Sequence, residues 1–441
     1  APCFPRTDRN SISAWTCTSM SAGSTKRLKL SRPSIGSSRQ SSGPALKMPG
    51  SQACGVAVPG LINLGNTCYL NAPLQILLRS PGFAEELKRA HTSRESASRG
   101  GAPSPPADQL LAELALLFDT MTRAPLPNCR PVTPSALLSK LRDRHPIFRS
   151  AGQQDAQELL RCLLLSLQEA SSRAARSPAP ATDRSEEGEE KGARKGEKEG
   201  EEEGVEESAG QAAGGGAAGA DDAGWVGQLF EGEVEYRTRC LECDSVRCRY
   251  EVFSELSLPV HYHSSLHWSL SRYFAEEQFR GANRFYCDEC QALTEATRTP
   301  RIRSVAPILT VHLKRFQQAS ASQPIAEARR VTSHVAAPSL LQLHRWATAE
   351  CAEALKDPLH LYAIVAHSGR SGCGHYTGYV EAPPGLPVPP QSWLCFDDEQ
   401  CSVLTAEDIT TLFAPTSQSP ALACLLFYRR KRCDDNIQSE M

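Results

Sequence analysis

The sequence lacks the features of a membrane-spanning, secreted or nucleic-acid-coating protein. In its 441 residues no apolar run approaches the roughly 18 residues that a membrane-spanning helix needs, and no charged segment followed by an apolar core stands at its start, as in a secretory signal. The 48 Lys and Arg nearly balance the 50 Asp and Glu, so the formal net charge of −2 gives no reason to expect a membrane surface or a nucleic acid as partner. The first residue is Ala rather than Met, as expected of a fragment or a processed product.

Cysteine, in contrast, is abundant. Seventeen cysteines without a secretory signal indicate a reducing compartment, the cytosol or the nucleus, where thiols bind metals or catalyse reactions instead of forming disulfides. A chain of this length can bury a large core as one big domain or as two to three ordinary ones.

Composition divides the chain into folded and unfolded segments. Residues 1–57 are rich in Ser, Arg and Pro, and residues 171–223 are dense in Glu, Lys, Gly and Ala. Neither segment can bury enough apolar surface to offset the entropy lost on ordering, so we expect both to be disordered, the second as a solvated tether. It would interrupt one large folded domain, 58–430, which is followed by a tail over 431–441 and has frayed basic residues at 429–432.

Periodicity predicts the elements of that domain. A helix over 134–141 would have Thr133 as N-cap and Pro134 at its first position. Another would run from Asp155, whose carboxylate favours the helix dipole, to about residue 167. A further helix is expected over 109–121, and strands are expected over 228–240, 284–286, 307–316, 331–337, 361–366, 376–380, 393–396 and 424–428.

One stretch has the chemistry of a nucleophile. Within 60–75 a Gly-Asn-Thr turn precedes Cys68, and apolar residues follow at helical spacing over 69–78. A thiol at a helix N-terminus lies at the positive end of the helix dipole, which favours the reactive thiolate. Asn63, five residues upstream, has a side-chain amide that can donate to the oxyanion of an attacked carbonyl. On these residues alone, a nucleophile and a small buried core cysteine are both open interpretations.

A histidine far along the chain supplies a matching base. Residues 361–380 indicate two strands joined by a Gly/Ser-rich loop, and His375 opens the second strand. Residues 392–399 then place Asp397 and Asp398 at the end of another short strand, where a carboxylate can accept the second imidazole N–H. Cys–His catalysis requires such groups to be neighbours in space, whatever their distance in sequence.

Two C-x-x-C pairs, Cys240 with Cys243 and Cys287 with Cys290, predict a metal site. Each short loop presents two thiolates from one turn, and two such loops build the tetrahedral four-cysteine site of structural zinc. Four protein ligands leave no open position for catalysis, so the zinc would be structural. The segment between the pairs is longer than compact zinc spacing, so hairpins must carry both loops to one end. Cys248 is a nearby thiol without an assigned partner.

Together these motifs resemble those of the ubiquitin-specific proteases, a papain-like family of cysteine isopeptidases, over about residues 60–430. The resemblance implies an α+β fold of three parts. These are a helical thumb over 58–170, zinc-ribbon β fingers over 225–300 that grip ubiquitin, and an antiparallel β palm over 301–430.

The resemblance also implies roles for single residues. Cys68 would be the nucleophile, His375 the general base and acid, and Asp397 the orienting third member. Asn63 would be the oxyanion donor, and Asp398 an alternative or auxiliary third residue. The implied reaction is thiol-dependent hydrolysis of the isopeptide or peptide bond after the C-terminal glycine of ubiquitin. Ubiquitin and ubiquitinated proteins would be the partners, and structural zinc the metal.

Within the family, the finger motifs at 229–232, 237–243 and 294–296 are most similar to one subgroup. It is the nuclear member that removes monoubiquitin from crosslink-repair proteins and from the DNA sliding clamp with the help of a WD40-repeat activator. This similarity favours the nucleus over the cytoplasm, a place in DNA repair and a WD40-repeat partner, with no direct contact to nucleic acid or membrane.

Pro73 departs from the family pattern. It lies inside the predicted helix of Cys68, where a proline removes a backbone hydrogen bond and costs about 3 kcal/mol or introduces a kink. A distorted helix would misaim Cys68, which leaves open a catalytically weak chain that still binds ubiquitin. A protease for a ubiquitin-like modifier with the same Gly-Gly tail also stays open. A zinc-ribbon nucleic-acid binder is disfavoured because no basic, aromatic-rich surface accompanies the cysteine pairs.

Overall fold

The computed structural model describes residues 52–53, 58–97, 105–123, 130–175, 224–262, 264–317, 329–370, 373–413 and 421–430, all within one compact unit. The segments predicted to be disordered, 1–57 and 171–223, fall almost entirely outside these ranges, and the predicted tail 431–441 lies wholly outside them. Two parts of the first two segments lie inside. Residues 52–53 form a short strand, and residues 171–175 continue a helix.

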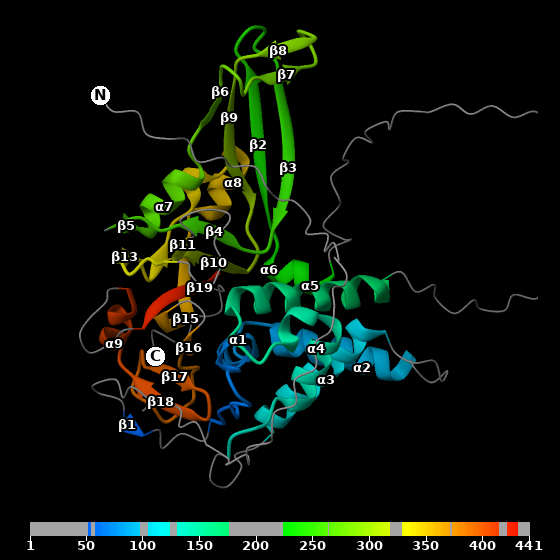
Figure 1. Ribbon diagram of the computed structural model, residues 1–441, viewed down its shortest axis with the longest axis vertical. Coiled ribbons are helices and arrows are strands. Elements are labelled where there is room, and N and C mark those ends of the chain that lie inside the picture. Colours follow the sequence, from blue (N-terminus) through cyan, green and yellow to red (C-terminus); the bar gives the residue numbers. More distant parts are fainter. Residues whose placement is uncertain are drawn as a thin grey trace, which may run out of the picture. The chain divides into compact units, whose positions relative to one another are not determined.

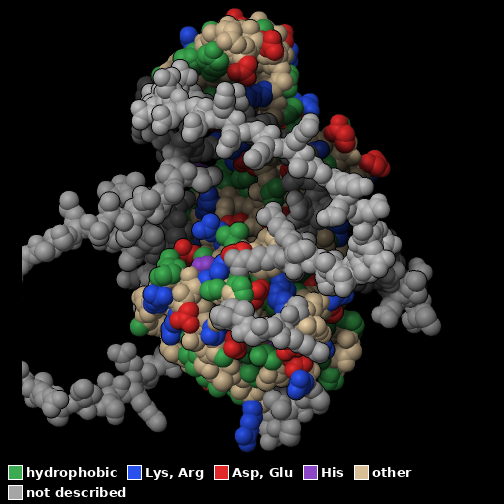
Figure 2. Space-filling view, turned by 90° about the vertical axis from the view of Figure 1, so that its right-hand side faces the viewer, with side chains coloured by type: hydrophobic (Ala, Val, Ile, Leu, Met, Phe, Trp, Pro, Cys, Tyr) green, Lys and Arg blue, Asp and Glu red, His purple; other side chains and the backbone are tan. Residues whose placement is uncertain are grey.

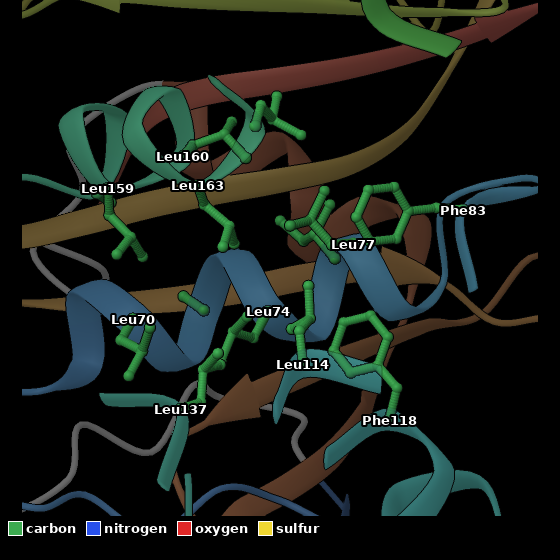
Figure 3. Close-up of a cluster of buried hydrophobic side chains, with 14 of the residues drawn as sticks. Leu70, Leu74, Leu77, Phe83, Leu114, Phe118, Leu137, Leu159, Leu160 and Leu163 are labelled. Carbon is green, nitrogen blue, oxygen red and sulfur yellow. The ribbon is translucent and has the colours of Figure 1, made fainter. Parts of the chain in front are cut away.

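Helices make up the N-terminal lobe, which we call the thumb (Figure 1). They are α1 (Cys68–Leu78), α2 (Phe83–Ala97), α3 (Pro106–Thr122), α4 (Ser135–Arg144), the 3₁₀ turn Pro146–Arg149, α5 (Ala156–Ala175) and α6 (Trp225–Phe230). The helix α1 lies at the centre, with all residues from Cys68 to Leu77 buried. Figure 3 shows leucine and phenylalanine side chains of α1, α3, α4 and α5 converging around it. Burying this apolar surface is the main source of the lobe's stability. Among the described helices, none combines the length and the apolar character that a membrane crossing requires.

The helix ends correct several predictions. Pro134, not Thr133, is the N-cap of α4, because its carbonyl accepts the first intrahelical bond, from the N–H of Leu138. Asp155 caps α5, since its Oδ1 accepts from two backbone N–H groups, 2.8 Å from that of Gln157. The helix runs past residue 167 to Ala175, and it buries Ala170 on the same face. The helix α2 was not predicted because few of its residues are apolar.

A nine-stranded sheet, which we call the palm, carries the C-terminal half of the domain (Figure 1). Its order is β1-β18-β17-β16-β15-β19-β10-β4, with β14 paired to β15, and every pair is antiparallel except β10 with β4. The strands are β1 (Gln52–Ala53), β4 (Leu256–Pro259), β10 (Ile308–Lys314), β14 (Leu340–Leu341), β15 (Leu359–Arg370), β16 (Cys373–Glu381), β17 (Trp393–Asp397), β18 (Gln400–Leu404) and β19 (Leu422–Arg430). The predicted α+β class with a largely antiparallel sheet is confirmed.

Two predictions about this sheet are wrong. Of the strand expected over 331–337, only β13 (Val335–Ala336) forms, and it pairs in parallel with β5 (Ser264–Ser265) outside the palm. Arg429 and Arg430 are not frayed: both lie in β19, and Arg429 is 2.9 Å from the carboxylate of Glu381. Smaller elements complete the described fold: α7 (Leu266–Tyr273), α8 (Ala349–Ala352), α9 (Ala406–Thr410), the pair β11 (Phe316–Gln317) and β12 (Arg329–Arg330), and the 3₁₀ turns His344–Trp346, Glu353–Leu355 and Thr411–Phe413.

A four-stranded ribbon, which we call the fingers, projects from the palm (Figure 1). Its order is β3-β2-β9-β6, and a separate hairpin of β7 and β8 stands at its far end. The strands are β2 (Gly232–Cys240), β3 (Val246–Phe253), β6 (Glu277–Phe279), β7 (Phe285–Cys287), β8 (Ala292–Thr294) and β9 (Ala296–Ser304). Figure 2 shows hydrophobic, acidic and basic side chains mixed at this end.

The strand predicted over 228–240 begins only at Gly232. Residues 228–230 belong to α6, because Phe230 is buried in the thumb core, with its ring centroid 5.9 Å from that of Phe83. The same helix closes the chain back onto α5. Ser171 Oγ accepts from the N–H of Trp225 at 3.0 Å, and Gln168 accepts from Gly227 at 2.9 Å.

Candidate active site

The helix α1 and the strand β16 touch backbone to backbone, and this contact brings the predicted nucleophile and base together. At Gly378 an added Cβ would lie 3.1 Å from the carbonyl oxygen of Ala72, so a side chain there would have to push the two backbones apart by a few tenths of an ångström. Cys68 is the first residue of α1 and is 2% exposed. The helix is continuous from Cys68 to Leu78 although Pro73 lies within it.

His375 stands between Cys68 and Asp397. Its Nε2 lies 2.5 Å from Oδ1 of Asp397, the last residue of the neighbouring strand β17. Hydrogen bonds from Asp397 first and Cys68 second raise the pKa of His375 to about 10, against the effect of burial. With Nε2 bound to Asp397, Nδ1 is the nitrogen left to face Cys68. The ring is therefore held as an imidazolium between a sulfur and a carboxylate, the arrangement that Cys–His catalysis needs.

Asp398 holds a different part of the site. It follows β17 with φ of 50°, the left-handed region, and one of its carboxylate oxygens lies within 4.8 Å of both the His375 ring and the Asp397 carboxylate. Its Oδ2 accepts from Nδ2 of Asn63 at 2.7 Å and its Oδ1 from Nδ2 of Asn71 at 2.8 Å. Burial raises the pKa of Asp398, and these two hydrogen bonds oppose that effect. Asp398 thus connects the loop before Cys68, through Asn63, to the helix α1, through Asn71.

Asn63 builds the turn that delivers Cys68. Its Oδ1 accepts from the N–H of Gly65 at 2.9 Å and from that of Thr67 at 3.1 Å, while its Nδ2 donates to Asp398. Gly65 has φ of 96°, which a residue with a side chain rarely adopts. A primary amide has two N–H donors, so the bond to Asp398 leaves the second for the predicted oxyanion.

Two further polar residues lie in the site, and the sequence did not predict the contacts of either. Asn71 lies three residues after Cys68, and its position as a polar side chain within an apolar helical run was the available signal. Gln153 contacts the backbone of Gly374, directly before His375, with both atoms of its amide. The residues alone indicated only a capped amphipathic helix, whereas the resemblance to the ubiquitin-specific proteases implied that this Gln-Gln-Asp stretch lies by the active-site cleft and the tail of ubiquitin.

The four predicted metal ligands converge at the end of the fingers. The Sγ atoms of Cys240, Cys243, Cys287 and Cys290 all lie within 4.8 Å of one another. The hairpin of β2 and β3 supplies the first pair and that of β7 and β8 the second, as the sequence required.

The electrostatics of this cluster fit a bound cation. The Thr294 hydroxyl lowers the pKa of Cys240 to about 6, whereas the neighbouring Cys243 sulfur raises the pKa of Cys290. Four thiolates at this separation repel one another, and a divalent metal removes that repulsion. The donor set of four sulfurs is the one that structural zinc prefers.

The sequence is similar to those of known ubiquitin carboxyl-terminal hydrolases. The family model described as ubiquitin carboxyl-terminal hydrolase matches residues 59–428. Ubiquitin carboxyl-terminal hydrolase 4 of Arabidopsis thaliana is 26% identical over 360 residues, which are 81% of this chain and 88% of the plant protein. The probable ubiquitin carboxyl-terminal hydrolase creB of Aspergillus clavatus is 32% identical over 308 residues, 68% of this chain but only 36% of the fungal protein.

A solved structure shares the fold. The SAGA Ubp8/Sgf11/Sus1/Sgf73 DUB module bound to ubiquitin aldehyde contains a chain that matches with a TM-score of 0.61 at 19% identity. The match covers 85% of this chain and 70% of that one.

Proposed function

This chain belongs to the ubiquitin carboxyl-terminal hydrolase family and is a thiol-dependent ubiquitin hydrolase, and we propose that Cys68, His375 and Asp397 are its catalytic triad. The bond cleaved is the isopeptide or peptide bond after the C-terminal glycine of ubiquitin in protein conjugates. The observation that carries the proposal is the imidazole of His375, which is hydrogen-bonded to Asp397 and lies close enough to Cys68 for both residues to raise its pKa.

The reaction follows from this geometry. The Cys68 thiolate attacks the carbonyl carbon of the terminal glycine, and the oxyanion forms at the N-terminus of α1, beside the second N–H of Asn63. His375 gives its proton to the departing lysine amine, which leaves a thioester on Cys68. The neutral imidazole then takes a proton from water, the hydroxide attacks the thioester, and ubiquitin leaves with a free carboxylate. Asp397 keeps the ring oriented throughout, and Asp398 keeps Asn63 in place.

Cys240, Cys243, Cys287 and Cys290 hold a structural zinc ion in this proposal. It supplies no chemistry to the reaction. It links the hairpin of β2 and β3 to the hairpin of β7 and β8 at the end of the fingers. This cross-link stiffens the surface that grips the body of ubiquitin.

Two finer proposals rest on sequence similarity in the fingers. The motifs at 229–232 and 237–243 support a nuclear enzyme that acts in DNA repair with a WD40-repeat activator. Rapid hydrolysis of a ubiquitin conjugate without any added protein would contradict the activator proposal, and exclusion of the tagged chain from nuclei would contradict the location.

Electrophilic probes test the activity directly. Ubiquitin with a C-terminal propargyl group should label wild-type chain, and Cys68→Ala should abolish labelling, because the probe traps only the attacking sulfur. Cys162→Ala, a half-buried free cysteine on α5, is the control and should label normally. Binding without labelling would support a ubiquitin-binding module instead. Labelling only by probes made from ubiquitin-like modifiers would assign the chain to one of those.

A further inference from the structure

The residues on either side of His375 are both held from the thumb. The backbone N–H and C=O of Gly374 bond to the side-chain oxygen and nitrogen of Gln153. The hydroxyl of Tyr376 donates to Oδ2 of Asp155 at 3.4 Å. Burial, and then the nearby Asp155 carboxylate, raise the pKa of Tyr376, so its hydroxyl stays protonated and able to donate.

The same thumb segment also contacts the loop that carries the nucleophile. Asn66, two residues before Cys68, donates from Nδ2 to the carbonyl of Ala151 at 3.0 Å. Asn66 has φ of 56°, so its backbone is in the left-handed region and this side-chain bond helps to hold the turn. Residues 151–155 therefore contact the chain next to Cys68 and the chain next to His375.

The sheet leaves Gly374 open to such a contact. The pairing of β16 with β17 starts only at Gly378, so the outer edge of β16 near His375 is not covered by β17. The Gln153 amide bonds to Gly374 as a peptide unit of a neighbouring strand would. Gly374 itself has no room for a side chain, since an added Cβ would lie 2.1 Å from Nε2 of His367.

A clamp at this place matters because Cys68 and His375 belong to different lobes. Cys68 moves with α1 of the thumb and His375 with β16 of the palm, and catalysis needs the sulfur and the imidazole at hydrogen-bond distance. A misplacement of about 1 Å can cost about 100-fold in rate.

We propose that Gln153, supported by Asp155, is a positioning residue that sets His375 against Cys68 by fixing the backbone of Gly374. It acts through His375 and does not touch the substrate. This inference rests on the proposed catalytic pair, but it makes a statement about the free enzyme that can be tested without ubiquitin.

The experiment compares the two neighbouring glutamines in the full chain. Gln153→Met keeps the side-chain volume and removes both hydrogen bonds, and Gln153→Ala repeats the loss with a smaller residue. Gln154→Met is the matched control, because Gln154 is half-buried like Gln153 but its amide bonds only locally, to the carbonyl of Gly152 at 3.4 Å. Thermal unfolding checks that each variant is folded.

Three readouts follow. Alkylation of Cys68 by iodoacetamide, quantified on its own peptide by mass spectrometry, reports the reactivity of the sulfur beside His375. We expect Gln153→Met to slow it about tenfold, with Gln154→Met unchanged. Hydrolysis of a ubiquitin conjugate should lose kcat about 10- to 100-fold with KM nearly constant. Ubiquitin affinity, measured with the Cys68→Ala background, should not change.

Other outcomes overturn the proposal. Weaker ubiquitin binding with normal alkylation would show that Gln153 contacts the substrate. A higher kcat/KM in Gln153→Met would show that Gln153 restricts access to the active site. Equal effects of Gln153→Met and Gln154→Met would show only a damaged loop. If the wild-type chain hydrolysed no ubiquitin conjugate, the proposed function would fail, yet the alkylation result would still decide the role of Gln153.

Discussion

The two sulfur sites of this molecule are built in opposite ways. The four cysteines of the fingers come in two close pairs, each carried by one hairpin, and every donor is a cysteine. Cys68 is a single sulfur whose partners, His375 and Asp397, come from the last quarter of the chain. One site is assembled from local turns, and the other only when two lobes meet.

The difference separates stability from reactivity. Sulfur surrounded by sulfur binds a metal and has no open position for a substrate. Sulfur beside an imidazolium at a helix N-terminus is nucleophilic. In the function proposed above, the same side chain serves structure in one site and catalysis in the other, according to which groups surround it. Loss of either site should therefore leave the other intact.

The largest effect should come from breaking the finger site. Cys287→Ser removes one ligand, and structural zinc is worth on the order of 10 kcal/mol in small zinc domains, so the fingers should lose most of their stability. Zinc content should fall from about one ion per chain, and amide exchange should rise over 232–304. Because the two sulfur sites are built independently, iodoacetamide should alkylate Cys68 at the normal rate in this variant. Cys248→Ser, an exposed cysteine outside the cluster, is the control; equal zinc loss there would contradict the ligand assignment.

Breaking the catalytic site should leave the zinc in place. Asp397→Asn keeps the size of the side chain but no longer stabilises the imidazolium, so kcat should fall about 10²- to 10⁴-fold with unchanged metal content. Asp398→Asn is the comparison, because Asp398 bonds Asn63 and Asn71. It should lower kcat without moving the pH dependence. A shift of the pH profile in Asp398→Asn alone would make Asp398 the residue that orients His375.

The two sites should also respond oppositely to pH. The folded-state pKa of His375, about 10, lies above its ordinary value of 6.5, so its contribution to stability is complete below pH 6.5 and is lost as the pH rises toward 10. The stability difference between wild type and Asp397→Asn, measured by urea unfolding, should shrink over that range. The effect should be modest, because the His375 side chain is 37% exposed. The zinc site should instead weaken in acid, as its thiolates take up protons. A His375 contribution that grew with pH would contradict the ion pair.

The smallest effect is expected at Pro73. Pro73→Ala restores an N–H that can donate to the carbonyl of Tyr69, and alanine is favoured over proline in a helix interior by up to about 3 kcal/mol. Loss of the buried proline ring offsets part of this gain, so a net stabilisation of about 1 kcal/mol is expected. Because Cys68 lies at the start of the helix, kcat should stay within about twofold of wild type. A tenfold rise in kcat would mean that the proline misaims the nucleophile.

The parts of the site that the sequence predicted are those with local signals. The helix after Cys68, the strand of His375 and the strand ending at Asp397 follow from short periodic runs, and the structure has each of them. The contacts of Gln153 and Asn71 could not be predicted in this way. Their partners lie far away in sequence, and the hydrogen bonds exist only after α1, α5 and β16 have packed together.

Misassigned elements have a similar cause. Residues 228–230 alternate like a strand, yet Phe230 packs into the thumb core and the segment becomes helical. Residues 331–337 have the composition of a strand, yet only two of them find a partner, β5, outside the palm. In both cases the tertiary contact overrides the local preference.

The join between α5 and α6 has a consequence for how the chain can vary. Ser171 and Trp225 are hydrogen-bonded, and Gly224 packs so closely on Ser171 that an added Cβ would meet its Oγ at 2.1 Å. Whatever length of chain connects Ala175 to Gly224 must leave and return at nearly one point, and doubling such a connection costs only about 0.6 kcal/mol. Evolution or an experimenter can therefore lengthen, shorten or replace residues 176–223, or insert a guest domain there, while α5 and α6 keep their contact.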